Sequence, residues 1–314
     1  MFAVRCLGVS LSIFFLGYAF LSFVVTQSWR LAARLTRSWE PSRTANLLAA
    51  FRLLPLAGAA AITLGYALPS FLLLEPGSIQ EPFGPMLIAF GCACVGGVVA
   101  GICRALAAQH KTSTVVSAWL NGASPLGIAS SVPVMQLRSR APILTVAGVL
   151  SPQVLVSEKT TDLLNPEELQ AAIGHEFAHV QQRDNLKKLL FRFAVFPGLG
   201  ALESAWSEAA EMAADDDAVH SPSQALDLAA ALIKLSRFAP VQPCPALTTG
   251  LTSHSTATLT ARIERLFQWQ DRTAFPPRKP LLRVLPALAA LGCVVLTYTP
   301  VITGMHEVTE WLVR

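Results

Sequence analysis

The chain has 314 residues, of which 53% are hydrophobic and only 14% are charged, and its mean hydropathy is positive. This composition excludes an ordinary soluble domain and predicts a membrane protein. The formal net charge is +4. Arginines that flank apolar segments account for this charge, so we expect no nucleic-acid partner. The six cysteines include no Cys-x-x-Cys pair, which argues against a disulfide framework and against a cysteine metal site.

Four apolar stretches contain no Asp, Glu, Lys or Arg, and each is long enough to cross a bilayer, which takes about 20 residues. They are residues 7–26, 53–74, 85–103 and 284–305. The first stretch is interpreted as a membrane span and not as a signal peptide, because no small-x-small cleavage site follows it. The sequence therefore predicts a multi-pass protein with four transmembrane helices, surrounded by lipid.

The basic segment 27–52 sets the predicted topology. It holds five arginines and a single acid, Glu40, and positively charged loops stay in the cytoplasm. We therefore expect residues 1–103 to form a membrane domain of three spans with a basic cytoplasmic loop. Residues 104–283 would form a cytoplasmic domain, and 284–314 a fourth span with a short tail. The expected location is the inner (cytoplasmic) membrane.

Residues 174–180 read Gly-His-Glu-Phe-Ala-His-Val and contain a His-Glu-x-x-His pair. On a helix, His175 and His179 lie one turn apart on the same face, where both imidazoles can bind one metal ion, and Glu176 projects beside them. Asn165 followed by Pro166 and two acids predicts the start of this helix, which we expect to reach about residue 190. The motif predicts a Zn²⁺ site with its own catalytic base, Glu176.

A third protein ligand is expected from the acidic helix predicted at 201–219, because a catalytic zinc site has three protein ligands and one open position. Glu211 is preferred, since Asp215 lies one turn further on the same face and could accept a hydrogen bond from a ligating histidine. Glu208, one turn earlier, remains the alternative ligand. The other acids of this helix are expected to be solvated charges: Glu203, Asp216 and Asp217.

Short extended runs between residues 132 and 157 predict a small β-sheet beside the motif helix. An exposed edge of such a sheet can hold an extended peptide through backbone hydrogen bonds; alternatively, the strands only cover the helix. The predicted fold class is thus an α-helical multi-pass membrane protein with an α+β zincin-type metalloprotease domain that carries a small β-sheet.

These segments resemble the BlaR/MecR family of membrane zinc metallopeptidases. The likeness lies in Ala-Gly-Val-Leu-Ser-Pro-Gln-Val-Leu-Val-Ser, Asn-Pro-Glu-Glu-Leu, His-Glu-Phe-Ala-His-Val-Gln-Gln-Arg-Asp-Asn and Glu-Met-Ala-Ala-Asp. It implies that His175, His179 and Glu211 are ligands and that Glu176 is the base. Receptors of that family continue into a penicillin-binding sensor, whereas this chain ends nine residues after its fourth predicted span, so we do not expect a β-lactam receptor. The related HtpX and CAAX prenyl endopeptidase family shares the same zinc elements and is the alternative lineage.

The expected function is that of a membrane-embedded, zinc-dependent endopeptidase acting on cytoplasmic or membrane-associated proteins in regulatory signalling, with a transcriptional repressor as one candidate substrate. Quality control or processing is the alternative suggested by the second lineage, and a homodimer is compatible with the sequence. His254 and Arg262 are candidate transition-state stabilisers by similarity to the related endopeptidases, although Arg262 could instead pack or form an ion pair. The alternative of another class is a non-hydrolytic membrane zinc-binding regulator.

Overall fold

The computed structural model describes residues 2–36, 38–75, 84–127, 132–238, 247–250, 256–269 and 298–310. The chain divides into two compact units. Unit 1 comprises Met1–Ser28, Leu53–Ala100 and Thr273–Arg314, and unit 2 comprises Trp29–Arg52 and Gly101–Arg272. Unit 1 is made of apolar helices, and unit 2 contains the small sheet and the His-Glu-x-x-His motif.

Long apolar helices occupy the first 120 residues. They are α1 (Phe2–Leu35), α2 (Pro41–Ile62), the π-helical turn η1 (Thr63–Ala67), α3 (Leu68–Leu74) and α4 (Pro85–Leu120). Among the described residues, three helical stretches are long and apolar enough to cross a membrane: Phe2–Leu35, Pro41–Leu74 and Pro85–Leu120. The first three predicted spans lie within these stretches.

The segment 27–52 and the fourth predicted span differ from the expectation or lie partly outside the described residues. The basic segment 27–52, expected to be a loop, is mostly helical, because α1 continues to Leu35 and α2 already begins at Pro41. This segment is rich in Ala, Leu and Arg, which favour helix, and proline is well suited to a first helical position. Most of the fourth predicted span lies outside the described residues, and residues 298–310 form a helix.

The helix of residues 298–310 packs within unit 1. Ser70 Oγ donates a hydrogen bond of 3.0 Å to the carbonyl of Ile302, and the rings of Tyr66 and Tyr298 lie 5.5 Å apart. A buried apolar cluster joins α1, α3 and α4 in the same unit and consists of Val9, Ile13, Ala67, Phe71 and Leu87. Apolar side chains and a buried hydroxyl bonded to a backbone carbonyl therefore hold these helices together.

Unit 2 contains a mixed sheet of five strands in the order β1-β2-β4-β3-β5. The strands are β1 (Ser124–Pro125), β2 (Val134–Leu137), β3 (Leu144–Ala147), β4 (Gln153–Ser157) and β5 (Thr248–Gly250). β2 and β4 are parallel, with Val134 opposite Val154, whereas the other neighbours are antiparallel. The three predicted extended runs correspond to β2, β3 and β4. The sequence did not predict β1 or the edge strand β5.

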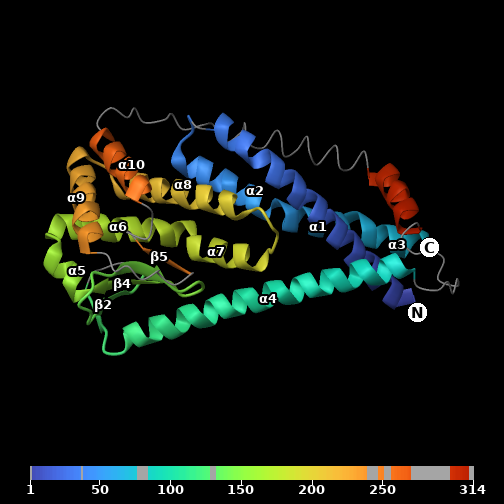
Figure 1. Cartoon of the computed structure of the whole chain (residues 1–314), viewed down its shortest axis with the longest axis horizontal. Coiled ribbons are helices and arrows are strands. Elements are labelled where there is room, and N and C mark those ends of the chain that lie inside the picture. Colours follow the sequence, from blue (N-terminus) through green and yellow to red (C-terminus); the bar gives the residue numbers. More distant parts are fainter. Residues whose placement is uncertain are drawn as a thin grey trace. The chain divides into compact units, whose positions relative to one another are not determined.

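Six helices accompany the sheet, and α6 lies between the strands and α8 (Figure 1). They are α5 (Glu158–Leu163), α6 (Pro166–Gln182), α7 (Asp184–Phe193), α8 (Gly200–Ala218), α9 (Pro222–Phe238) and α10 (Thr256–Phe267). The core between α6, α9 and the sheet is aliphatic and includes Val154, Val156, Ile173, Leu228 and Leu232. The motif helix is thus held on several sides by apolar packing.

Both ends of α6 have identifiable causes. The predicted start is confirmed: Asn165 Oδ1 accepts a hydrogen bond from the Glu168 N–H, and the Glu168 carboxylate accepts one from the Asn165 N–H. The end comes earlier than predicted, because Arg183 adopts a left-handed conformation with φ 55° and a new helix begins at Asp184. A left-handed residue costs about 1 to 2 kcal/mol. Hydrogen bonds from Asn185 Nδ2 to the carbonyls of Val146 and Gly148 offset part of this cost.

Replacing Asn165 with Ala removes the acceptor at the start of α6. We expect the free energy of unfolding to fall by about 1 kcal/mol, measured by chemical unfolding of the detergent-purified protein. Asn165→Ser keeps a capping oxygen without adding charge and should retain most of the stability. Equal losses in the two variants would show that the cap does not contribute.

Candidate metal centre

Two helices supply a cluster of three buried side chains. His175 and His179 come from α6 and Glu211 comes from α8, and their ligand atoms all lie within 4.8 Å of one another. The Nε2 atoms of the two histidines are 3.1 Å apart. The Glu211 carboxylate lies 3.4 Å from His175 Nε2 through one oxygen and 3.5 Å from His179 Nε2 through the other. Local helix spacing pairs the histidines, and the packing of α8 on α6 adds the carboxylate.

Small residues allow α6 and α8 to approach closely. A Cβ placed on Gly174 would meet Ala218 at ordinary van der Waals distance, 3.8 Å. Alanines are buried on both helices, namely Ala171, Ala172 and Ala178 on α6 and Ala210, Ala213 and Ala214 on α8. Because these side chains end at Cβ, the longer ligand side chains of the two helices reach the same point.

The cluster fits a four-coordinate metal ion. Ligand atoms bound tetrahedrally at about 2.0 to 2.2 Å lie roughly 3.3 to 3.6 Å apart, and the separations in the cluster are 3.1, 3.4 and 3.5 Å. Imidazole nitrogens suit transition metals, and a carboxylate completes a common donor set. Three protein ligands leave one position open, which is typical of catalytic sites and not of structural ones.

A carboxylate holds the second nitrogen of each histidine. His175 Nδ1 lies 2.9 Å from Asp215 Oδ1, and His179 Nδ1 lies 2.7 Å from Asp184 Oδ2. These contacts leave both Nε2 atoms directed at the cluster, and such carboxylates also raise the basicity of ligating histidines. Asp215 was predicted from the sequence, but Asp184 was not. Asp184 lies five residues after His179, and its side chain can contact His179 only because α6 ends at Arg183.

Arg262 of α10 lies inside the site and is only 1% exposed. Its Nε and Nη2 donate to the two Asp215 oxygens at 2.7 Å each, and its Nη1 lies 3.0 Å from Glu211 Oε2. The structure therefore brings this predicted residue to the carboxylates of the cluster. The other predicted stabiliser, His254, lies outside the described residues. Glu208, the alternative ligand, is exposed and is not part of the cluster.

Two acids expected to be solvated are instead half-buried in ion pairs. Glu203 pairs with Arg52 of α2 at 2.8 Å, and Asp216 pairs with Arg265 of α10. Asp217 is exposed and accepts a hydrogen bond from Gln182. The expectation was wrong for Glu203 and Asp216 because their partners come from distant parts of the chain.

Burial and opposite charges shift the pKa values of the site. Burial by itself lowers the pKa of His175, but the close carboxylates of Asp215 and Glu211 raise it to about 9. Burial raises the pKa of Asp215, but Arg262 and His175 bring it down to about 2. The metal-free site therefore holds a proton on His175. A metal ion must displace that proton, so metal binding weakens as the pH falls.

Glu176 lies beside the cluster and is fully buried. Within the described part of the chain, neither of its carboxylate oxygens has a hydrogen-bond partner. Burial raises the pKa of Glu176 to about 8, although His175 acts in the opposite direction. A carboxyl group with a pKa near neutral can both accept and donate a proton at physiological pH, which suits general acid–base chemistry.

Room for other molecules adjoins the cluster. A cavity of about 410 Å³ reaches His179 and Asp184 and is also lined by the turn between β3 and β4, including Gly148, Leu150 and Pro152. Leu150 is 91% exposed at this turn. The cavity therefore borders His179 of the metal cluster and is lined by both apolar and polar residues.

Glu211→Gln should weaken metal affinity by more than about 100-fold, since loss of an outer carboxylate alone already costs 10- to 100-fold. Glu208→Gln makes the same change one turn away, on an exposed residue, and should leave affinity unchanged. Competitive chelator titrations and metal analysis of the purified variants would measure both. A greater loss in Glu208→Gln would make Glu208 the ligand.

Asp184→Asn keeps the size of the side chain but removes the charge next to His179. We expect metal affinity to fall about 10- to 100-fold, measured by the same titrations. Asp217→Asn is the matched control, because Asp217 is exposed on α8 and does not contact either histidine. Unchanged affinity in Asp184→Asn would mean that this carboxylate does not support His179.

Comparison with known families points to the same region. Residues 146–238 match the family model described as peptidase family M48. The matched segment runs from β3 to the end of α9 and includes His175, Glu176, His179 and Glu211. A search of curated proteins found no match. The chain thus contains a segment that is similar to the M48 peptidases, together with apolar helices, which indicates a membrane-associated metallopeptidase; the match does not single out the BlaR/MecR group.

Proposed function

We propose that the chain is a membrane-embedded, zinc-dependent endopeptidase that hydrolyses peptide bonds of cytoplasmic or membrane-associated proteins. The observation that carries this proposal is the convergence of His175, His179 and Glu211 beside the buried carboxyl of Glu176. The match of this segment to an M48 peptidase domain and the three apolar helices support it.

Zn²⁺ is the metal that we propose for the cluster, because two imidazoles and one carboxylate are a common donor set of catalytic zinc. His175 and His179 would bind it through Nε2, and Glu211 through its carboxylate. A bound Zn²⁺ would lower the pKa of a water molecule and polarise the carbonyl of the scissile bond. Asp215 and Asp184 would keep the two imidazoles oriented through their Nδ1 atoms.

Glu176 is the proposed proton carrier. It would accept a proton from the attacking water and later deliver it to the nitrogen of the leaving amine. Burial raises its pKa to about 8, and a nearby cation would lower that pKa, which favours the ionised form needed to accept a proton. Arg262 already uses its Nε, Nη1 and Nη2 on Asp215 and Glu211, which supports a role in positioning these carboxylates.

The substrate would lie in an extended conformation along β5, the strand at one edge of the sheet. Both α6 and α7 contact β5, and Lys188 Nζ donates a hydrogen bond of 2.8 Å to the carbonyl of Thr248. Pairing with an edge strand holds a peptide by its backbone and tolerates many side chains. An endopeptidase with several protein substrates needs such tolerance.

Residues 104–283 would face the cytoplasm of the inner membrane, between the three spans of 1–103 and a fourth span in 284–314. The support is the excess of arginine in 27–52 and the basic residues Arg104 and Lys111 after the third apolar stretch. A regulatory role, with a transcriptional repressor as substrate, rests on the resemblance to the BlaR/MecR family. Quality control or processing is the alternative role.

Glu176→Gln should retain zinc but lower peptide cleavage by about 10²- to 10⁴-fold, the usual contribution of a general base. Zinc content and cleavage of a mixed peptide library would be measured for the detergent-purified protein. Glu167→Gln, an exposed change on the same helix, should match the wild type in both. Equal cleavage by zinc-loaded wild type and Glu176→Gln would contradict Glu176 as the proton carrier, and no cleavage by either would leave a zinc-binding regulator.

A further inference from the structure

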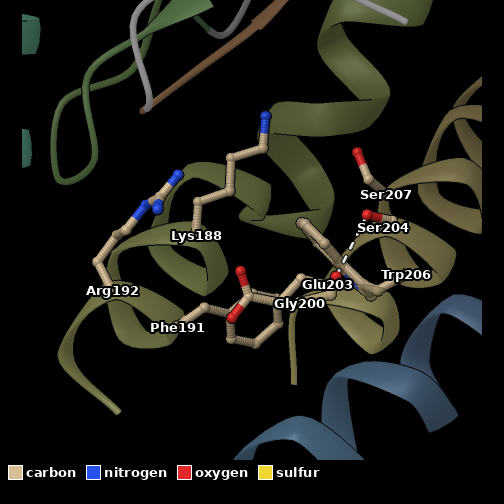
Figure 2. Close-up of a pocket in the computed structure, with 8 residues that line it drawn as sticks. All are labelled: Lys188, Phe191, Arg192, Gly200, Glu203, Ser204, Trp206 and Ser207. Carbon is tan, nitrogen blue, oxygen red and sulfur yellow. Dashed lines mark hydrogen bonds between the residues drawn. The ribbon is translucent and has the colours of Figure 1, made fainter. Parts of the chain in front are cut away.

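A second cavity, of about 240 Å³, lies between α7 and α8 (Figure 2). Lys188 and Arg192 reach it from α7, and Ser204 and Ser207 from α8. These side chains are hydrogen-bond donors, and two of them are cations. The cavity also lies at the first turn of α8, where backbone N–H groups favour a negative charge.

The one acid in the lining already has a partner. Glu203 Oε1 accepts a hydrogen bond of 2.9 Å from Arg52 Nε. Arg52 is only 2% exposed, and its Nη2 also donates to the carbonyls of Phe191 and Ala194 at 2.8 and 2.6 Å. The charge of Glu203 is therefore balanced by a buried guanidinium that does not line the cavity. Lys188 and Arg192 therefore give the cavity lining a net positive charge.

Trp206 provides an independent indication of a missing acceptor. It lines the cavity, is only 2% exposed, and packs edge-on against Phe191 with ring centroids 4.9 Å apart. Among the residues that the structure describes, its buried Nε1–H has no hydrogen-bond partner. A buried donor without an acceptor is costly. A ligand oxygen in the cavity would satisfy this donor.

The cavity is linked both to the metal centre and to the strand proposed to hold the substrate. Ser207 and Ser204 precede Glu211 by four and seven residues on the same face of α8, about 6 and 10.5 Å along the helix. Lys188 lines the cavity and also donates to Thr248 of β5, the strand proposed to hold the substrate. The charge of Lys188 also acts on Glu176. An extended peptide rises about 3.3 Å per residue, so the cavity is roughly three residues from the scissile bond.

We propose that this cavity is a substrate subsite that accepts an acidic side chain, Asp or Glu, about three residues from the scissile bond. Arg192 and Lys188 would pair with the carboxylate, and the indole N–H of Trp206 would donate to it. This proposal rests on the peptidase function proposed above. An anionic lipid headgroup has the same charge, but the link through Lys188 to β5 favours a peptide.

The first experiment profiles cleavage of a mixed library of short synthetic peptides by the zinc-loaded, detergent-purified protein. Mass spectrometry of the products should show enrichment of Asp and Glu two to four residues from the cleaved bond. Two matched peptides, with Asp or Asn at that position, should then differ about tenfold in kcat/KM, as expected for one hydrogen-bonded ion pair that is partly open to solvent.

Variants of Arg192 test which residue produces the preference. Arg192→Gln should reduce the Asp-to-Asn ratio to about twofold or less, and Arg192→Glu should favour a peptide with Lys at that position. The Asp-to-Asn ratio of kcat/KM is measured within each variant, so a general loss of activity does not change it. The zinc content reports whether the domain is folded. Arg237→Gln removes an equal charge from an exposed residue of α9 and should keep the wild-type ratio.

Any of the following results would overturn the proposed subsite. If the wild type cleaves peptides without acidic enrichment, or if Arg192→Gln keeps the full Asp preference, the subsite is wrong and the peptidase function stands. If the zinc-loaded wild type cleaves no peptide, the function fails and the subsite with it. If phosphatidylglycerol vesicles, compared with phosphatidylcholine vesicles, change cleavage of both matched peptides and Arg192→Gln removes that effect, the cavity binds a lipid headgroup instead.

Discussion

The buried contact of Arg262 with Asp215 and Glu211 is the interaction on which the candidate metal centre depends. It joins α10 to α8, and Asp215 passes the contact on to His175 of α6. Without the guanidinium, the two buried carboxylates would lose the cation that contacts them both. Breaking a buried ion pair in this way costs about 3 to 5 kcal/mol. The same contact therefore stabilises the packing of α6, α8 and α10. It also positions the Glu211 carboxylate that would bind a metal ion.

The geometry of the cluster follows from how α6 and α8 meet. Alanine and glycine at their contact bring the backbones close, so that a glutamate from one helix reaches the two histidines of the other. The end of α6 at Arg183 is equally important, because it returns Asp184 to His179. A longer α6 would have carried Asp184 away along the helix. A local break in secondary structure thus completes the support of the second histidine.

Arg52 is a second buried guanidinium in unit 2, and it organises the turn that leads into α8. By binding the carbonyls of Phe191 and Ala194 and the carboxylate of Glu203, it fixes the end of α7 against the first turn of α8. The cavity beside Trp206 and the metal cluster therefore share one rigid helix. Because both sites lie along α8, the rise of this helix sets the expected distance between a side chain bound in the cavity and the scissile bond at the cluster.

The sequence by itself determined the features that depend on local spacing. The pairing of His175 with His179 follows from the helical repeat, the start of α6 from its capping residues, and the apolar helices from length and composition. It preferred Glu211 as the third ligand but kept Glu208 as the alternative, because α8 carries several acids and local spacing does not say which of them is buried. Tertiary packing placed the preferred Glu211, and not Glu208, in the cluster and brought the predicted Arg262 to its carboxylates, and it alone added Asp184 and β5. These contacts join residues far apart in the chain, and their free energy comes from burial and charge pairing that exist only in the folded domain.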